Sequence, residues 1–303
     1  LISPSSIAVL GASNRVGSFG NSAMTNILSG GFVGRLFPVN PSSVTIFGMK
    51  CYKSILDIEH HVGLAIIITP SKVVPHVMEE CGKKGVKTAI IISAGFKETG
   101  EQGKVLEESI KRIAKKNRMR VVGPNCIGVI NTDPITSLNA SFTKGMPESG
   151  SIALVSQSGA ICVAMLEFAK KRNIGFSKVF SLGNKMDVDE NDLLRVLAND
   201  VSTKVILMYI EDLTSGKKFI EIASKITGET RKRKPILALK GGESVIGAKS
   251  IASHTGALAG SKEAYTAIFA QSGVLRLETL DELFDYAIAF AYQPILSKEA
   301  TVV

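Results

Sequence analysis

The chain has 303 residues, which exceeds one ordinary domain and predicts two. Its 45% hydrophobic residues suffice for buried cores, and 6% aromatics without tryptophan make those cores aliphatic. The net charge of +9 favours a polyanionic partner such as a phosphorylated cofactor, nucleic acid or an acidic subunit. The four cysteines include no Cys-x-x-Cys pair, which argues against a zinc site or a disulfide framework and favours a reduced, cytoplasmic setting.

Local composition argues against a membrane or nucleic-acid partner. The longest apolar runs, such as residues 64–68, have only the length of a strand, so no membrane span is predicted. The basic run of residues 231–234 has no aromatic residues among its charges, which favours a solvated loop. The chain begins at Leu1 without a methionine or a signal-peptide pattern, and we expect a fragment or missing first residues.

In the first half of the chain, short β-branched apolar runs alternate with amphipathic stretches. Helices are expected over residues 71–84 and 101–116, and in the second of these Val105, Ile110, Ile113 and Ala114 are expected on one apolar side. The alternation predicts βαβ units in a doubly wound parallel sheet. The expected strands are residues 7–10, 64–68, 88–92 and 120–122.

The pattern then restarts, because the sequence Ser-Ile-Ala-Val-Leu at residues 6–10 is echoed by Ser-Ile-Ala-Leu-Val at 151–155. The turn-rich residues 146–150 before the second copy resemble a linker. We therefore predict two α/β domains with mainly parallel sheets, residues 1–145 and 146–303. The later elements are strands at 178–182, 204–210, 235–239 and 274–277, with helices near 160–171, 191–199, 216–225, 263–271 and 280–291.

Small residues follow the first predicted strand and would let backbone N–H groups approach a phosphate at a helix start. No acidic residue stands at residues 36–41, after the second strand of such a domain, where a nicotinamide dinucleotide needs one, so a different phosphorylated ligand is favoured. Other loops at strand ends are either structural turns or parts of the same site. The candidate residues are Gly11, Ala12, Ser13, Asn14, Arg15, Val16 and Gly17, with Thr69, Pro70, Ser93, Ala94, Gly95 and Asn125 in the later loops.

The second domain holds a candidate anion site, since Ser158 and Gly159 follow a strand and open a helix with unpaired N–H groups. Ser158 is not in a Gly-x-Ser-x-Gly turn, which argues against a hydrolase nucleophile. Glu211 ends a strand, and pattern alone does not separate its role from that of Asp212, a possible helix cap. His254 stands among small residues, so a large partner can approach its nucleophilic ring.

A nearby acidic cluster at Asp187, Asp189, Glu190 and Asp192 lacks calcium-loop spacing. The acidity of a helix start explains it more simply than a metal site. No metal is therefore expected in this chain.

Five segments in this order resemble the NDP-forming acyl-CoA synthetases, relatives of succinyl-CoA synthetase, over nearly the whole chain: residues 11–14, 37–41, 123–128, 156–159 and 253–257. The resemblance implies a CoA-binding Rossmann-like first domain and a flavodoxin-like second domain with a phosphorylatable histidine. It matches His254 to that histidine and Glu211 to the acid that steadies it. Ser158 and Gly159 match the helix start that receives the phosphoryl group, and residues 13–16 and 93–95 match CoA-contacting loops.

The implied activity is that of the α portion of an ADP-forming acyl-CoA synthetase, with coenzyme A as a substrate. ATP or ADP, with Mg²⁺, is expected in an ATP-grasp β subunit or a fused C-terminal domain, and the enzyme is expected to be a hetero- or homo-oligomer. Val163 stands where succinate-type enzymes have a tyrosine, which favours acetate or another short acid, beside phosphate, as a substrate. Ser42 and Ser43 replace a lysine of the family, a charge for which Arg15 compensates.

Two other functions are compatible with parts of this pattern. One is a CoA-binding regulatory module, or an acetyltransferase-linked relative with an inactive ligase half, against which His254 argues. The other is a nicotinamide oxidoreductase, against which the missing acidic residue argues.

Overall fold

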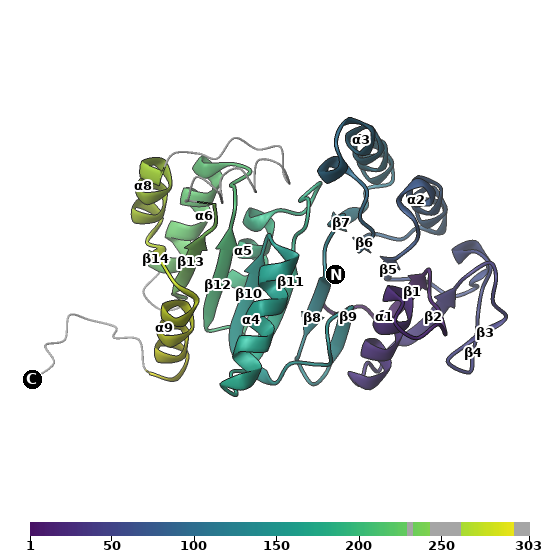
Figure 1. Cartoon of the computed structure of the whole chain (residues 1–303), viewed down its shortest axis with the longest axis horizontal. Coiled ribbons are helices and arrows are strands. Elements are labelled where there is room, and N and C mark those ends of the chain that lie inside the picture. The colour runs from purple at the N-terminus through teal and green to yellow at the C-terminus, as the bar shows by residue number, and fades with distance from the viewer. Residues whose placement is uncertain (229–232, 243–261, 294–303) are drawn as a thin grey trace, which may run out of the picture.

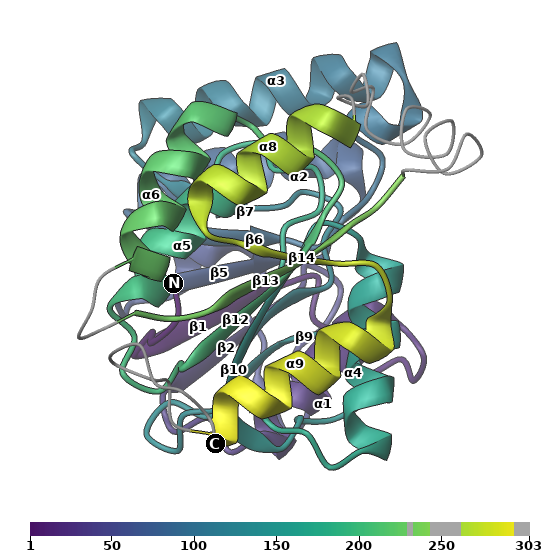
Figure 2. The same ribbon diagram turned by 90° about the vertical axis from the view of Figure 1, so that its left-hand side faces the viewer.

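The structure is a computed structural model, and it describes residues 1–228, 233–242 and 262–293. Its strands form two large sheets, which lie side by side along the long axis of the molecule (Figure 1). Helices cover both sides of the strands, with α2, α3, α6 and α8 along one side and α1, α4 and α9 along the other (Figure 2). The predicted α/β class with mainly parallel sheets is therefore confirmed.

The first sheet has five parallel strands in the order β2-β1-β5-β6-β7. Both of its faces are covered, which explains why its strands are continuous apolar runs. Alternate residues of one strand enter different cores: Ile7 and Val9 pack with α1, whereas Ala8 and Leu10 pack with α2 and α3. The strands are β1 (Ser6–Leu10), β2 (Arg35–Val39), β5 (Leu64–Ile67), β6 (Thr88–Ile91) and β7 (Arg120–Val122), and the helices are α1 (Phe19–Ser29), α2 (Val74–Lys84) and α3 (Glu101–Lys116).

Short elements complete this half of the chain. A small hairpin of β3 (Thr45–Ile46) and β4 (Met49–Lys50) follows β2, and single 3₁₀ turns occupy Ile55–Asp57, Ser71–Val73 and Lys97–Thr99. The bounds predicted for α3 agree with the structure, but the expected apolar side is wrong at Val105, whose side chain is exposed. Glu107 is buried instead, because it finds hydrogen-bond partners outside the helix.

The second sheet has seven strands in the order β14-β13-β12-β10-β11-β8-β9. The first five are parallel, whereas β8 pairs antiparallel with both β11 and β9. Its strands are β8 (Gly128–Asn131), β9 (Leu138–Ser141), β10 (Ser149–Ser156), β11 (Phe176–Ser181), β12 (Val205–Ile210), β13 (Ile236–Lys240) and β14 (Leu275–Leu277). The helices are α4 (Gly159–Lys171), α5 (Glu190–Ala198), α6 (Gly216–Gly228), α8 (Lys262–Ser272) and α9 (Leu280–Tyr292).

The change from one sheet to the other occurs between β7 and β8, before residue 145. Strand β8 belongs to the second sheet because Val129 lies opposite Phe180 of β11. Helix α1 of the first half packs on β9, and its Asn26 amide donates to the carbonyls of Ser141 and Thr143 at 2.9 and 2.6 Å. The division of the chain at residue 145 stays a prediction. Among the described residues, no helix combines the length and the apolar character that a membrane crossing requires.

Candidate functional site

The first candidate site lies where β1 ends and α1 begins, and two glycines make it possible. Gly11 has a φ of +93°, and a Cβ atom there would lie 2.8 Å from the carbonyl oxygen of Ile68. A Cβ atom on Gly20, in the first turn of α1, would lie 2.0 Å from the carbonyl oxygen of Gly11. The backbone of α1 therefore approaches the strand end as closely as a phosphate-binding turn requires.

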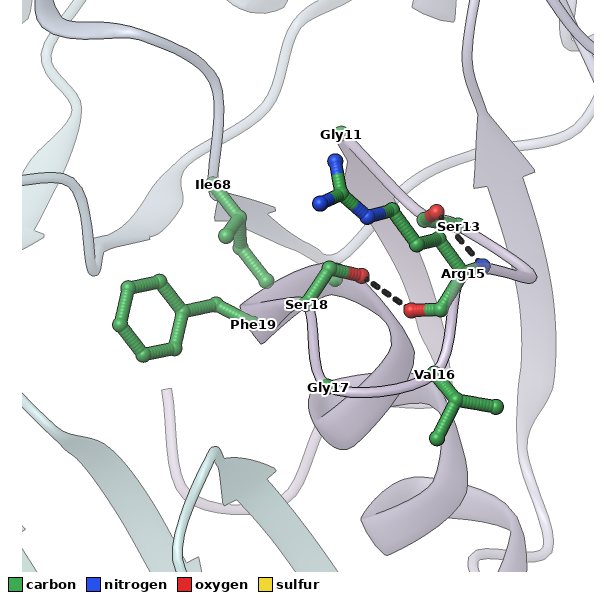
Figure 3. Close-up of a pocket in the computed structure, with 9 residues that line it drawn as sticks. Gly11, Ser13, Arg15, Val16, Gly17, Ser18, Phe19 and Ile68 are labelled. Atoms are coloured by element: carbon green, nitrogen blue, oxygen red, sulfur yellow. Dashed lines mark hydrogen bonds between the residues drawn. The ribbon is translucent and has the colours of Figure 1, made fainter.

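This turn surrounds a hollow of about 430 Å³, a volume typical of a ligand pocket (Figure 3). The Ser13 hydroxyl accepts from Arg15 N at 3.0 Å, and the Ser18 hydroxyl donates to the Arg15 carbonyl at 2.8 Å, so the backbone of Arg15 is held from both sides. Its guanidinium extends toward Gly11 and makes no hydrogen bond or ion pair to any described residue. The lining residues are Gly11, Ser13, Arg15, Val16, Gly17, Ser18, Phe19, Gly20 and Ile68.

The structure anchors the other residues predicted in this turn without placing them all in the hollow. Ala12 is buried, and its carbonyl accepts from the Asn40 amide at 2.8 Å. Asn14 turns toward the β3–β4 hairpin, where its amide donates to the Thr45 carbonyl at 3.1 Å and accepts from Phe47 N at 2.9 Å. Asn14 therefore supports the loop, and Arg15 supplies the charge.

The later loops meet at the same carboxyl edge of the first sheet. The Ser93 hydroxyl donates to the Thr69 carbonyl at 2.5 Å, and the Ser93 carbonyl accepts from Asn125 N at 2.9 Å. A Cβ atom on Gly95 would lie 2.6 Å from the Ser71 hydroxyl, so Ala94 and Gly95 pass close to the loop of Thr69 and Pro70. The Thr69 hydroxyl is buried and has no hydrogen-bond partner among the described residues.

The second candidate site lies at the carboxyl edge of the second sheet, where Ser158 caps α4. Its hydroxyl accepts from Ile161 N at 3.3 Å, and no acidic residue stands in the first turn, which begins at Gly159. The positive end of the helix dipole is therefore not neutralised by the helix itself.

Gln157 connects the start of α4 to the loop that carries Glu211. Its side-chain oxygen accepts from both Glu211 N and Asp212 N, at 2.6 and 2.9 Å. Glu211 thus follows β12 directly beside the Ser158 turn. Burial, and then the charge of Glu211, raises the pKa of Tyr209 to about 12. The predicted His254 lies outside the described residues, so its distance from Glu211 is not a feature of this structure.

Beneath this edge lies a buried ionic network that the sequence analysis did not predict. The Glu190 side chain is fully buried and accepts from Lys185 Nζ at 3.2 Å and from Thr214 N at 2.7 Å. Lys185 Nζ also lies 2.7 Å from Asp212 Oδ1, and the Gln157 amide donates to Glu190 at 3.4 Å. The network fixes the backbone of residues 211–214.

The acidic cluster therefore divides into separate structural roles. Asp189 caps α5 by accepting from Asn191 N and Asp192 N, as the helix-start interpretation predicts. Asp187 and Asp192 instead bind Arg120 of the first sheet, at 3.0 and 2.7 Å. Glu190 belongs to the buried network, and a signal for it existed in the sequence, because residues 190, 193, 194 and 197 share the apolar face of a helix. Among the described residues, no group of three or more His, Cys, Asp or Glu side chains has a geometry that could hold a metal ion.

Val163 lies on α4 and is 37% exposed. It lines a second hollow, of about 670 Å³, between α4 and residues 142–148. Phe142 of this hollow contacts Phe19 of the first one, with ring centroids 4.7 Å apart. The two hollows therefore share an aromatic wall.

Two family models match this chain, one in each half. Residues 5–132 match the CoA binding domain, and residues 149–290 match the succinyl-CoA ligase like flavodoxin domain. A 4-hydroxybutyrate–CoA ligase (ADP-forming) of Nitrosopumilus maritimus is 50% identical over the whole chain, which spans 43% of that protein. The α subunit of acetate–CoA ligase (ADP-forming) I of Pyrococcus furiosus is 45% identical over 97% of this chain and 63% of its own length.

The solved structures agree with these matches. The dinucleotide-forming acetyl-coenzyme A synthetase 1 of Ca. Korarchaeum cryptofilum, in complex with phosphate and ADP, superimposes with a TM-score of 0.91 at 40% identity. The match covers 97% of this chain and 62% of that one. The chain thus spans about two fifths to two thirds of the length of these relatives. It belongs to the family of ADP-forming acyl-CoA ligases, of whose α part it carries the CoA-binding domain and the succinyl-CoA ligase-like flavodoxin domain.

Proposed function

We propose that this chain is the α portion of an enzyme that interconverts acyl-CoA, ADP and phosphate with an acid, CoA and ATP. The observation that supports this most directly is the contact of Gln157 with Glu211 N, which sets a carboxylate beside the open helix start at Ser158. Strand β13 is parallel to β12, with Lys240 opposite Ile210. Strand β13 therefore ends at the edge where Glu211 lies, and His254 follows it in the sequence.

In the proposed first step, a phosphate oxygen attacks the thioester carbonyl carbon, the C–S bond breaks, and CoA leaves as the thiol once protonated. The acyl phosphate remains. A ring nitrogen of His254 then attacks its phosphorus, the bond to the acyl oxygen breaks, and the acid leaves as a carboxylate. The phosphohistidine finally transfers its phosphoryl group to ADP in the ATP-grasp portion, where Mg²⁺ is expected with the nucleotide. The two phosphoryl transfers depend mainly on positioning and charge neutralisation.

The residues of this chain have distinct parts in that sequence. The loop of residues 11–17, with the loops of Thr69–Pro70, Ser93–Gly95 and Asn125, holds CoA. Glu211 orients one ring nitrogen of His254 and raises the basicity of the other. The start of α4 at Ser158 and Gly159 neutralises the charge of the transferred phosphoryl group.

For the acid we propose acetate or another short acid. Val163 leaves open space beside α4 where a tyrosine would fill it, and the relatives include ligases named for acetate and 4-hydroxybutyrate. An ATP-grasp portion, as a β subunit or a fused domain, completes the enzyme in a hetero- or homo-oligomer. This fits the observation that the chain spans 43% of one relative and 63% of an α subunit.

Phosphoenzyme formation tests the proposal. The full enzyme, including its ATP-grasp portion, is incubated with ATP labelled at the γ-phosphate, and an acid-labile, base-stable label is expected on this chain. The label disappears in His254→Ala and persists in His76→Ala, a matched control at an exposed position of α2. Normal turnover of acyl-CoA with phosphate and ADP by His254→Ala would overturn the mechanism. CoA binding without any phosphoenzyme in the unaltered protein would instead favour the regulatory module.

Glu211→Gln should keep the fold and lower the yield of phosphoenzyme, because the amide does not stabilise a positive ring. Glu221→Gln is its matched control, since Glu221 is an exposed glutamate of α6 that pairs with Lys225. Equal phosphoenzyme yields in the two variants would remove Glu211 from the proposed role.

A further inference from the structure

Asn184, in the loop between β11 and α5, is the residue of the second half of the chain on which several first-half groups converge. Its amide nitrogen donates to Glu98 Oε2 at 2.6 Å and to Glu107 Oε2 at 2.7 Å. The backbone carbonyl of Asn184 accepts from Lys97 Nζ at 2.6 Å, and its backbone N–H donates to the Pro124 carbonyl at 2.9 Å. Asn184 is 5% exposed, so these bonds are protected from water.

On one side, Asn184 leads directly to a proposed CoA loop. The other oxygen of Glu98 accepts from Gly95 N at 2.6 Å and from Phe96 N at 3.1 Å. Burial alone would raise the pKa of Glu98, but the hydrogen bonds from Asn184, Gly95 and Phe96 bring it below the ordinary value. Glu98 is therefore an ionised clamp that holds the Gly95 loop and Asn184 at once.

On the other side, Asn184 leads to the loop of Glu211. The next residue, Lys185, binds Asp212 Oδ1 at 2.7 Å and Glu190 Oε2 at 3.2 Å. Lys185 has a φ of +52°, which its two ionic contacts help to maintain. Gln157 donates to Glu190 and accepts from Glu211 N. A series of polar contacts, joined by the peptide bond between Asn184 and Lys185, thus connects Gly95 with Glu211.

We propose that Asn184 is a positioning residue that holds the CoA-binding loop of the first half in register with the Glu211 loop of the second. This rests on the proposed function, in which the thioester is held by one half of the chain and the phosphoryl acceptor by the other. Reaction between groups on two bodies requires their atoms at about 3–3.5 Å, and an error of about 1 Å costs on the order of a hundredfold in rate. CoA binding uses only the first half of this chain, and phosphorylation of His254 by ATP uses only the second, so neither event depends on how the two halves are aligned.

The test measures the two half-reactions of the full enzyme separately, in the unaltered protein, Asn184→Asp and Asn184→Ala. Formation of phosphoenzyme from ATP and the Kd for CoA should stay within about twofold. Consumption of the isolated phosphoenzyme by acetate plus CoA should slow by about 10- to 100-fold, in kcat rather than in the KM for CoA. Asn199→Asp, an exposed position at the end of α5, is the matched control and should behave as the unaltered enzyme.

A rescue variant separates positioning from folding. The Asn184 amide nitrogen donates to both Glu98 and Glu107, so the carboxylate introduced by Asn184→Asp faces two carboxylates. Glu98→Gln and Glu107→Gln together give it two amide donors, while the oxygen at position 98 can still accept from Gly95 N and Phe96 N. This triple variant should regain at least about fivefold of the lost rate, and it decides the question if the single variants do not fold.

Equal losses in both half-reactions, no loss in either, or no rescue by the triple variant would overturn the role of Asn184. A failure of the proposed function looks different, because the unaltered enzyme would then form no phosphoenzyme at all.

Discussion

Reversal of the charge at Arg15 is the most direct test of the first candidate site. The backbone of Arg15 is held by Ser13 and Ser18, while its guanidinium projects over the hollow beside Gly11. Arg15→Met keeps most of the aliphatic stem and removes the charge, and Arg15→Glu reverses it. Because no described residue pairs with this guanidinium, neither change leaves an unsatisfied partner in the part of the chain that the structure describes.

The size of the effect follows from the exposure of the site. Arg15 is exposed, so its attraction for a phosphate about 4 Å away is close to the value in water, about 1 kcal/mol per charge. Arg15→Met should therefore weaken CoA binding by about 1 kcal/mol, or about fivefold. Arg15→Glu loses that attraction and adds a repulsion of similar size, which gives about 2 kcal/mol, or about 30-fold.

Isothermal titration calorimetry with CoA at low ionic strength measures both changes, and the difference between the variants should shrink as salt is added. NAD should give no binding to the unaltered protein. Arg112→Glu carries the same change of charge on the exposed side of α3 and should bind CoA as the unaltered protein does. An Arg15→Glu variant within twofold of the unaltered Kd would refute the placement of the CoA phosphates.

Three further predictions concern packing, an ion pair and the acid. Gly20→Ala should cost about 1–3 kcal/mol in denaturant unfolding and weaken CoA binding, because its Cβ would lie 2.0 Å from the Gly11 carbonyl; an unchanged free energy would contradict the close approach. Lys178→Met removes the ammonium group that lies 2.7 Å from the Asp200 carboxylate, which keeps the hydroxyls of Ser202 and Thr203, and should cost about 1–3 kcal/mol at pH 7. Burial would raise the pKa of Asp200, but Lys178 brings it below the ordinary value, so the pair stabilises the fold above about pH 4 and that contribution is lost as the pH falls through the folded-state pKa. The deficit of Lys178→Met should therefore narrow toward acid pH, and a deficit constant from pH 7 to 3 would exclude this origin. Kinetics with acetate, propionate, isobutyrate and succinate should favour the monocarboxylates, with Val163→Tyr most harmful to the bulkiest acid; a preference for succinate would reject the proposed acid class.

Much of the fold follows from local pattern. Strand β5 is a continuous apolar run because helices cover both faces of its sheet, and α3 has the bounds that its amphipathic period predicts. Strand β8 had no such signal, since it pairs with β11, which lies far along the chain, and β9 joins the sheet only through β8. In α3, Val105 is exposed and Glu107 is buried, the reverse of what an apolar helix face predicts. The Glu107 carboxylate can be buried because Asn184, from another element, donates a hydrogen bond to it.

The sequence by itself determined the two small-residue turns, at residues 11–17 and 156–159, because the chemistry of a helix start depends on neighbours within a few positions. It also marked Glu211 and Asp212 without separating them. Only the tertiary structure showed that Asp212 forms an ion pair with Lys185 and that Glu190 belongs to the same buried network. Likewise, Asn184 meets Glu98 across 86 positions of the chain. Such contacts arise when two packed sheets bring distant loops together, and no short-range pattern encodes that distance.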